Sequence, residues 1–225
     1  MVTHLKPSIE QQKLLDLHLK LVIEENKKTN LTRIDTWESG QILHVEDSLV
    51  GLPEAQGAPS GSYLDMGTGA GFPGIPLAIM TGRTTVLADS VGKKTKALDY
   101  FIEQLGLEDK VSTYNGRVEE LALDHPEGFA LVTARALSNL ASLMELASPL
   151  LCLDGLLVCY KAQEGHHELE HAFAIQDKLG LEFVSARDVH LSDGKTNRVL
   201  IVFKKIHEPM VPLPRRVGIA QKKPY

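Results

Sequence analysis

The chain has 225 residues, 43% of them hydrophobic and 24% charged, which is enough to bury the core of one large domain or of a domain with an appendage. It has no apolar run of about 18 residues and no hydrophobic segment typical of secretion near its start, so we expect a cytoplasmic protein without a membrane partner. The net charge of −5 argues against a body that binds nucleic acid over its whole surface.

Residues 1–56 are predicted to form a helical N-terminal extension. Ser8 and Gln11 have the spacing of a capping box, and an amphipathic period continues from there to about residue 27. A second helix is predicted to begin near Asp35. The run PEAQGAPSGS, residues 53–62, is predicted to be a loop because of its proline, glycine and serine content.

Residues 57–206 alternate between strand-like and helix-like patterns, which predicts βαβ units and a parallel sheet. Strands are expected at 62–66, 84–89, 110–114, 129–134 and 155–161, and helices at 74–80, 93–106, 118–123, 139–151 and 166–180. Two last strand-like runs, 181–191 and 198–206, flank the turn-rich SDGKTN and predict an antiparallel hairpin. The pattern indicates an α/β fold, a Rossmann-like seven-stranded sheet of the methyltransferase kind.

The stretch YLDMGTGAGFPGIPLAIM, residues 63–80, places Gly67 and Gly69 between a strand and a helix, where a nucleoside cofactor can lie against bare backbone. Asp65 would repel a pyrophosphate but accept the ammonium group of a methionine moiety. Asp89 ends the next predicted strand, where an acid binds ribose hydroxyls, although capping of the following helix explains it equally well. Together these residues favour S-adenosylmethionine.

Residues 207–225 form the third predicted part, a basic tail. This segment carries Arg215, Arg216, Lys222 and Lys223 and only one acid, Glu208, at its start. Charge alone allows either a phosphate-binding edge or a solubilising tail.

Seven segments in order make the sequence resemble the small-subunit ribosomal RNA guanine-N7 methyltransferase family, also called glucose-inhibited division protein B. They are NLTRI (30–34), HVEDSL (44–49), LDMGTGAGFPGIPLAI (64–79), LADSVGKKTKAL (87–98), GRVEEL (116–121), TARAL (133–137) and PRRVGIAQKKP (214–224). The resemblance implies a class I S-adenosylmethionine-dependent fold that methylates guanine-527, in the 530 loop of 16S rRNA. Its partner would be that rRNA, in the small ribosomal subunit or in an assembly intermediate.

The resemblance also implies roles for individual residues. Gly67 and Phe72 would line the cofactor loop, Val118 and Glu119 would lie beside the adenine, and Arg135 would face the methyl-transfer site and position the substrate. The basic side chains of residues 215–223 would contact RNA phosphates.

The expected chemistry requires no general base, because guanine N7 has a free lone pair at neutral pH and loses no proton. The sequence has neither the Asn/Asp-Pro-Pro-aromatic motif of amine methylation nor a Pro-Cys nucleophile. Two alternatives stay open: an assembly factor that binds cofactor and rRNA without catalysis, and a methyltransferase of proteins or small molecules.

One motif argues for a different class of protein. HELEH, residues 167–171, matches the zinc-binding H-E-x-x-H pattern of peptidases. It lies in a polar helix start with no independent signal for a third ligand, so we expect no metal site.

Overall fold

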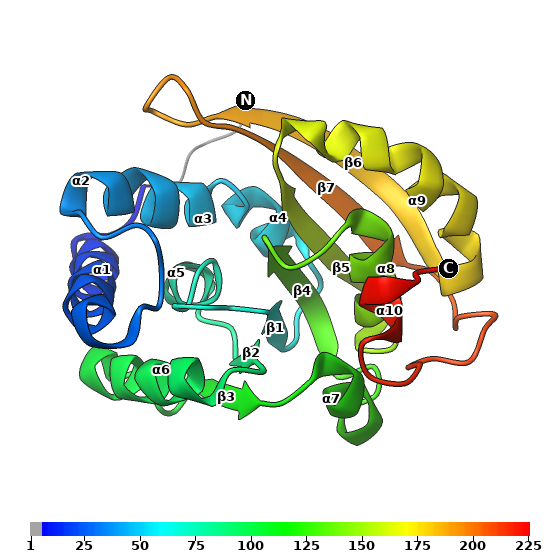
Figure 1. Ribbon diagram of the computed structural model, residues 1–225, viewed down its shortest axis with the longest axis horizontal. Coiled ribbons are helices and arrows are strands. Elements are labelled where there is room, and N and C mark those ends of the chain that lie inside the picture. Colours follow the sequence, from blue (N-terminus) through cyan, green and yellow to red (C-terminus); the bar gives the residue numbers. More distant parts are fainter. Residues whose placement is uncertain (1–5) are drawn as a thin grey trace.

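The computed structural model describes residues 6–225 and centres on a seven-stranded sheet (Figure 1). In spatial order the strands are β3 (Val111–Asn115), β2 (Thr85–Asp89), β1 (Tyr63–Met66), β4 (Phe129–Arg135), β5 (Leu151–Lys161), β7 (Asn197–Lys205) and β6 (Leu181–His190). The first five are mutually parallel, and β7 is antiparallel to both β5 and β6. The predicted parallel sheet with a closing hairpin is confirmed.

Helices cover both faces of the sheet, since its central strands are buried on both sides. One face carries α4 (Leu52–Gly57), α5 (Gly74–Thr81) and α6 (Gly92–Leu105), and the other carries α7 (Val118–Asp124), α8 (Leu140–Ala147) and α9 (Leu169–Ile175). Strand β1 shows the division: Leu64 and Met66 pack with the second set, and Tyr63 packs with the first. Such two-sided burial explains the continuous apolar runs in the sequence.

The N-terminal segment is helical and lies over the first of these faces, beside α5 and α6 (Figure 1). It consists of α1 (Ile9–Thr29), α2 (Trp37–Gly40), the π-helical η1 (Gln41–Glu46) and α3 (Asp47–Leu49). The capping box of Ser8 and Gln11 is present at the start of α1. Buried Leu19 and Val22 of α1 join the cluster around Phe101 of α6.

Three local predictions were wrong. Residues 53–62 are not all loop, because Pro53 is tolerated in the first turn of α4 while Leu52 and Ala55 are buried. The helix expected at 139–151 ends at Ala147, since Pro149 lacks the backbone N–H that would continue it, and β5 already begins at Leu151. The helix expected at 166–180 is broken into η2 (Gln163–Glu168), α9 and η3 (Asp177–Leu179). The second helix begins at Trp37, near the predicted Asp35, where the Thr36 side chain caps it by accepting from the backbone N–H of Ser39.

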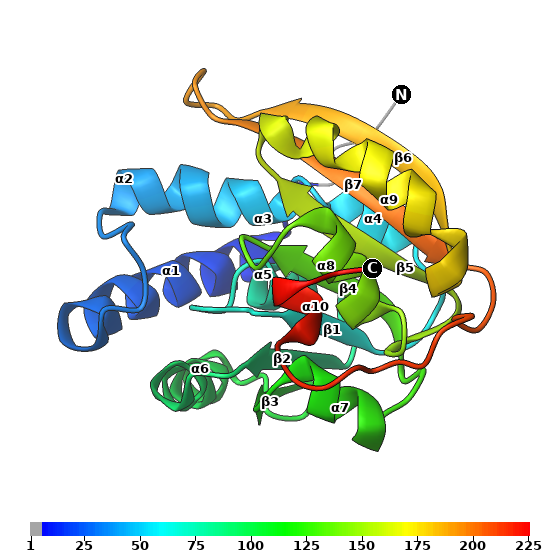
Figure 2. The same cartoon turned by 45° about the vertical axis from the view of Figure 1, so that its right-hand side comes forward.

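The C-terminal segment, residues 207–225, leaves β7 and runs back past α7 to α8, where it forms the short α10 (Ile219–Lys222) (Figure 2). It therefore lies against the body of the protein. Between residues 6 and 225, no helix has the length and apolar character that a membrane crossing requires. The division into three domains stays a prediction.

Candidate cofactor and substrate site

Two cavities open at the edge of the sheet where its parallel strands end. The smaller, about 220 Å³, is lined by Gly67, Asp89 and Val118 and by their neighbours at the ends of β1, β2 and β3. The larger, about 410 Å³, lies between the end of β4 and the N-terminal helices. Ala136, directly after β4, lines both cavities. Ligands of open α/β sheets bind at this edge, so the arrangement suits two reactants side by side.

The glycine loop between β1 and α5 is held from behind by Asp65. This carboxylate is fully buried and accepts hydrogen bonds from the Gly74 backbone N–H at 2.9 Å and from Thr133 Oγ1 at 2.6 Å. Burial raises the pKa of Asp65 to about 6. The structure therefore gives Asp65 a supporting position beneath the loop, whereas the sequence suggested contact with an ammonium group.

Gly67 and Gly69 form the accessible part of this loop, with φ values of +70° and +62°. These left-handed conformations favour glycine. A Cβ at Gly69 would meet no atom within 4 Å, so the space above this glycine is free for a ligand.

Asp89 joins the loop to the next strand. Its Oδ2 accepts from the Gly69 N–H at 3.1 Å, and its Oδ1 accepts from the Val91 N–H at 2.9 Å. Val118 and Gly116 form the neighbouring wall at the end of β3. Asp89 thus supports the turn before α6 and also lines the cavity, although the N-cap residue of α6 is Val91 and not Asp89.

Phe72 is enclosed in a stack of three rings. The His18 ring of α1 lies 4.4 Å from it and the His44 ring of η1 lies 4.3 Å from it on centroids. Burial lowers the pKa of His18 to about 4, and burial together with the nearby Arg135 cation lowers that of His44 to about 3. Both rings are therefore neutral near pH 7, and they attach the helical extension to the glycine loop.

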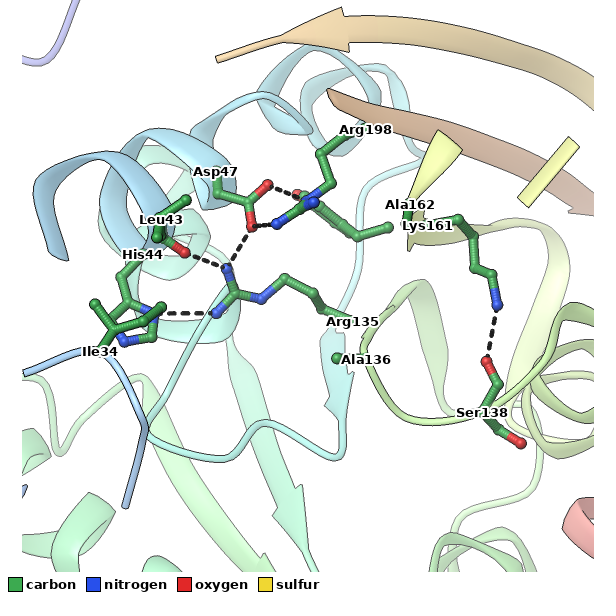
Figure 3. Close-up of a pocket in the computed structure, with 11 residues that line it drawn as sticks. Ile34, Leu43, His44, Asp47, Arg135, Ala136, Ser138, Lys161, Ala162 and Arg198 are labelled. Carbon is green, nitrogen blue, oxygen red and sulfur yellow. Dashed lines mark hydrogen bonds and ion pairs between the residues drawn. The ribbon is translucent and has the colours of Figure 1, made fainter. Parts of the chain in front are cut away.

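Arg135 projects from the end of β4 into the larger cavity and lies within an ionic cluster (Figure 3). Its Nη1 donates to the Leu43 carbonyl at 3.1 Å and to Asp47 Oδ2 at 2.9 Å. Arg198 of β7 donates to the same carboxylate, and Lys161 donates from the opposite wall to the Ser138 carbonyl at 3.0 Å. The cavity thus presents cations whose positions are fixed by protein acceptors.

Sequence reasoning missed Asp47, Arg198 and Lys161 as site residues. Asp47 stands in the HVEDSL segment, which could have signalled it. Arg198 and Lys161 lie in strands with ordinary apolar patterns, and only the order of β4, β5 and β7 in the sheet brings them to this cavity.

The C-terminal segment is docked by several polar contacts. Arg215 donates to both oxygens of the buried Glu145 at 2.5 Å, and its guanidinium lies 4.1 Å from the ring centroid of Tyr225. Glu119, which does not line either cavity, accepts from the Gly218 N–H at 2.7 Å. Basic side chains that the segment leaves exposed are Arg216, Lys222 and Lys223.

The HELEH residues serve the fold. Glu168 pairs with Lys161 and accepts from the Leu140 N–H at the start of α8, and His171 Nε2 donates to the Tyr225 carbonyl. No group of three metal-binding side chains comes together among residues 6–163 and 165–225.

Most of the chain matches one family of known proteins. The family model described as rRNA small subunit methyltransferase G matches residues 11–197. A ribosomal RNA small subunit methyltransferase G of Lactobacillus johnsonii is 35% identical over 220 residues, which is 96% of this chain and 92% of that protein. A ribosomal RNA small subunit methyltransferase G of Streptococcus equi subsp. zooepidemicus is 36% identical, over 95% of this chain and 91% of that protein.

Solved structures share the fold at low identity. The O-methyltransferase from Bacillus cereus in complex with SAH superposes with a TM-score of 0.60 at 17% identity, over 84% of this chain and 90% of that chain. Geranyl diphosphate methyltransferase in complex with SAM gives a TM-score of 0.53 at 15% identity, over 72% of this chain and 85% of that chain. The class I methyltransferase fold is thereby confirmed.

Proposed function

We propose a target nucleotide for this chain, which belongs to the rRNA small subunit methyltransferase G family and is an S-adenosylmethionine-dependent rRNA methyltransferase. The proposed target is N7 of guanine-527, in the 530 loop of 16S rRNA. The supporting observation is the pair of cavities that meet at Ala136, one suited to a nucleoside cofactor and one to a base. We further propose that the enzyme works in the cytoplasm, where bacterial rRNA and its assembling subunits are found.

The residues of the smaller cavity fit S-adenosylmethionine. Apolar Val118, Leu137 and Leu146 can enclose a flat adenine, and the Asp89 carboxylate can accept hydrogen bonds from ribose hydroxyls. The open space at Gly69 lets a ligand approach the backbone closely. When bound, the cofactor supplies an electrophilic methyl group on a sulfonium.

The larger cavity fits a purine that attacks through a lone pair. Because N7 loses no proton, the protein must align the two reactants and exclude water. Arg135 is the candidate positioning group, since Asp47 and the Leu43 carbonyl fix its guanidinium at the wall nearest Ala136. Its planar donors suit the oxygen of a guanine edge or a phosphate.

For the RNA backbone we propose Arg216, Lys222 and Lys223, whose exposed side chains can each neutralise a phosphate. Arg215 stands apart from them, because its guanidinium is already paired with Glu145. We assign it to docking the C-terminal segment. We further propose that Glu119 has a similar docking role through Gly218, and that Val118 contacts the adenine.

The test is methylation of small subunits that lack the modification, with labelled S-adenosylmethionine and nucleoside analysis of the 16S rRNA. We expect labelled 7-methylguanosine that maps to the 530 loop. Label in another nucleoside would contradict the proposed atom or base. Cofactor binding without label would instead favour an assembly factor.

The same assay tests Arg135. Arg135→Ala should lower the rate of methylation at least tenfold while cofactor affinity stays unchanged. Lys110→Ala is the control, because Lys110 is exposed and precedes β3 at the opposite edge of the sheet. Full methylation by Arg135→Ala would remove this residue from the mechanism.

A further inference from the structure

The C-terminal segment contributes a side chain to the smaller cavity. Gln221 of α10 lines it together with Gly116 and Arg117 from the end of β3. The segment is held there by Ser142 Oγ, which donates to the buried Ala220 carbonyl at 2.8 Å, next to Gln221 in the chain. A residue more than 100 positions away in sequence thus completes this wall.

The position of Gln221 is at the end of the cavity that is remote from methyl transfer. Arg135 ends β4 and Ala136 follows it. The glycine loop follows β1 and Asp89 ends β2, and these two strands lie between β4 and β3 in the sheet. A ligand that reaches from Ala136 across Asp89 therefore brings its far end to β3. In S-adenosylmethionine the ribose lies between the sulfonium, which carries the methyl group, and the adenine, so that far end is the adenine.

The orientation of the Gln221 amide is fixed by chemistry. Arg117 Nη2 lies 2.8 Å from Gln221 Oε1, and a guanidinium can only donate, so the amide oxygen must face Arg117. The amide nitrogen then points away from Arg117 as a donor, and the oxygen keeps a second lone pair. An adenine edge offers the complement, a ring nitrogen that accepts and an exocyclic amine that donates.

We propose that Gln221 recognises the adenine of the cofactor, donating from Nε2 to a ring nitrogen and accepting from the exocyclic amine. This inference rests on the proposed function, since it concerns the same cofactor. It makes the C-terminal segment part of the cofactor site, in addition to any contact that it makes with RNA.

The experiment compares the binding of S-adenosylhomocysteine with that of S-inosylhomocysteine by calorimetry. The second ligand has a carbonyl in place of the exocyclic amine. The wild-type chain should prefer the adenosyl ligand by about tenfold, the effect of losing one well-placed buried hydrogen bond. Gln221→Met keeps the length of the side chain but cannot accept from the exocyclic amine, so its preference should fall to within about twofold.

Two further variants make the result decisive. Gln221→Leu likewise removes both polar atoms and should also abolish the preference, and it replaces Gln221→Met if that variant fails to fold. Ile219→Ala alters an exposed residue of the same short helix and should bind both ligands as the wild type does.

Retention of the wild-type preference in both Gln221 variants would overturn the inference. Equal weakening of both ligands would also overturn it, because that result indicates a structural role alone. If the wild-type chain binds neither ligand, the proposed function fails instead, and the two failures are thus distinguished.

Discussion

Arg198 donates two hydrogen bonds to the carboxylate of Asp47, from Nε at 2.9 Å and from Nη2 at 3.2 Å, and so ties strand β7 to the start of helix α3. Arg135 donates to the same carboxylate, whose residue is only 1% exposed. One buried anion therefore orients two cations at the wall of the larger cavity. Removing it would leave both guanidinium groups without their common partner.

Asp47→Asn is expected to lower the free energy of unfolding by about 3 kcal/mol, as when one partner of a buried ion pair is removed. The rate of methylation should fall at least tenfold, since Arg135 loses its fixed position, whereas cofactor affinity should hold. Urea denaturation, the methylation assay and calorimetry measure the three quantities. The control Glu46→Gln alters the neighbouring carboxylate, which pairs with Ser192. Unchanged activity in Asp47→Asn would contradict the positioning role.

Gly69→Ala and Gly106→Ala form a matched pair. Both glycines have left-handed φ values, +62° and +64°, and a Cβ at either would meet no atom within 4 Å. Each substitution should therefore destabilise the fold by about 1 kcal/mol. Only Gly69→Ala should weaken the binding of S-adenosylhomocysteine, because its methyl group would occupy the space proposed for the cofactor. Equal affinities in the two variants would place the ligand elsewhere.

Substitution of the adjacent Arg215 and Arg216 distinguishes a side chain that docks the C-terminal segment from one that is free to contact RNA. Arg215→Gln should lower the free energy of unfolding by about 2 kcal/mol, because it breaks a pair with a buried carboxylate at a partly exposed site. Arg216→Gln should change it by less than about 0.5 kcal/mol, since this side chain is exposed. Thermal or urea unfolding measures both. If Arg216→Gln were the more destabilising of the two, the docking role of Arg215 would be wrong.

The exposed basic side chains of the C-terminal segment should determine part of the salt dependence of RNA binding. Each substitution of Arg216, Lys222 or Lys223 by glutamine should reduce the slope of log affinity against log salt concentration by about 0.7 to 0.9. Filter binding to a 16S rRNA fragment over a range of salt concentrations gives the slope. Lys110→Gln, at the far edge of the sheet, should leave it unchanged. A slope unaffected by all three substitutions would exclude these side chains as phosphate contacts.

Stability should depend on pH through His18. Its pKa is lowered to about 4 in the fold, while in the unfolded chain it is near 6.5, so the unfolded chain binds the proton first as pH falls. Stability is thus full above pH 6.5 and declines by about 3 kcal/mol between pH 6.5 and 4 on account of this ring. The slope of unfolding free energy against pH is proportional to the number of protons that the chain takes up on unfolding. In His18→Gln this number should be smaller by up to one proton between pH 6.5 and 4.

Comparing wild type and His18→Gln at each pH isolates this contribution. Asp65 acts in the opposite direction, because its raised pKa removes stability as pH rises from about 4 to 6. It contributes equally to both proteins and cancels in the difference. Equal slopes in the two proteins would show that His18 is not held neutral by the fold.

Most of the fold could be predicted, because the sheet depends on local patterns. The hydrophobic runs that became β1, β2 and β4 and the helix stop at Gly106 are visible within short windows of sequence. The helix α4 escaped prediction because its proline and glycine content indicates a loop, and only its contacts with the sheet outweigh that tendency.

The residues of the candidate site could be singled out only where a strand end and a local motif coincide. Gly67 and Asp89 stand at strand ends and Val118 follows β3 in one of the resembling segments, and all three line the smaller cavity. Arg198 and Gln221 could not be found in this way, because their roles depend on strand order and on the path of a tail. Charge alone groups Arg215 with Arg216, whereas in the structure Arg215 pairs with the buried Glu145 and the Arg216 side chain is exposed.

The ring stack around Phe72 has a consequence for how the protein is made. Its members come from residues 18, 44 and 72, so a growing chain can close the stack before most of the sheet exists. The larger cavity must wait for Arg198, and the smaller cavity must wait for Gln221. During synthesis the glycine loop would therefore be ordered early, whereas methylation would begin only after β7 has paired and Gln221 has left the ribosome.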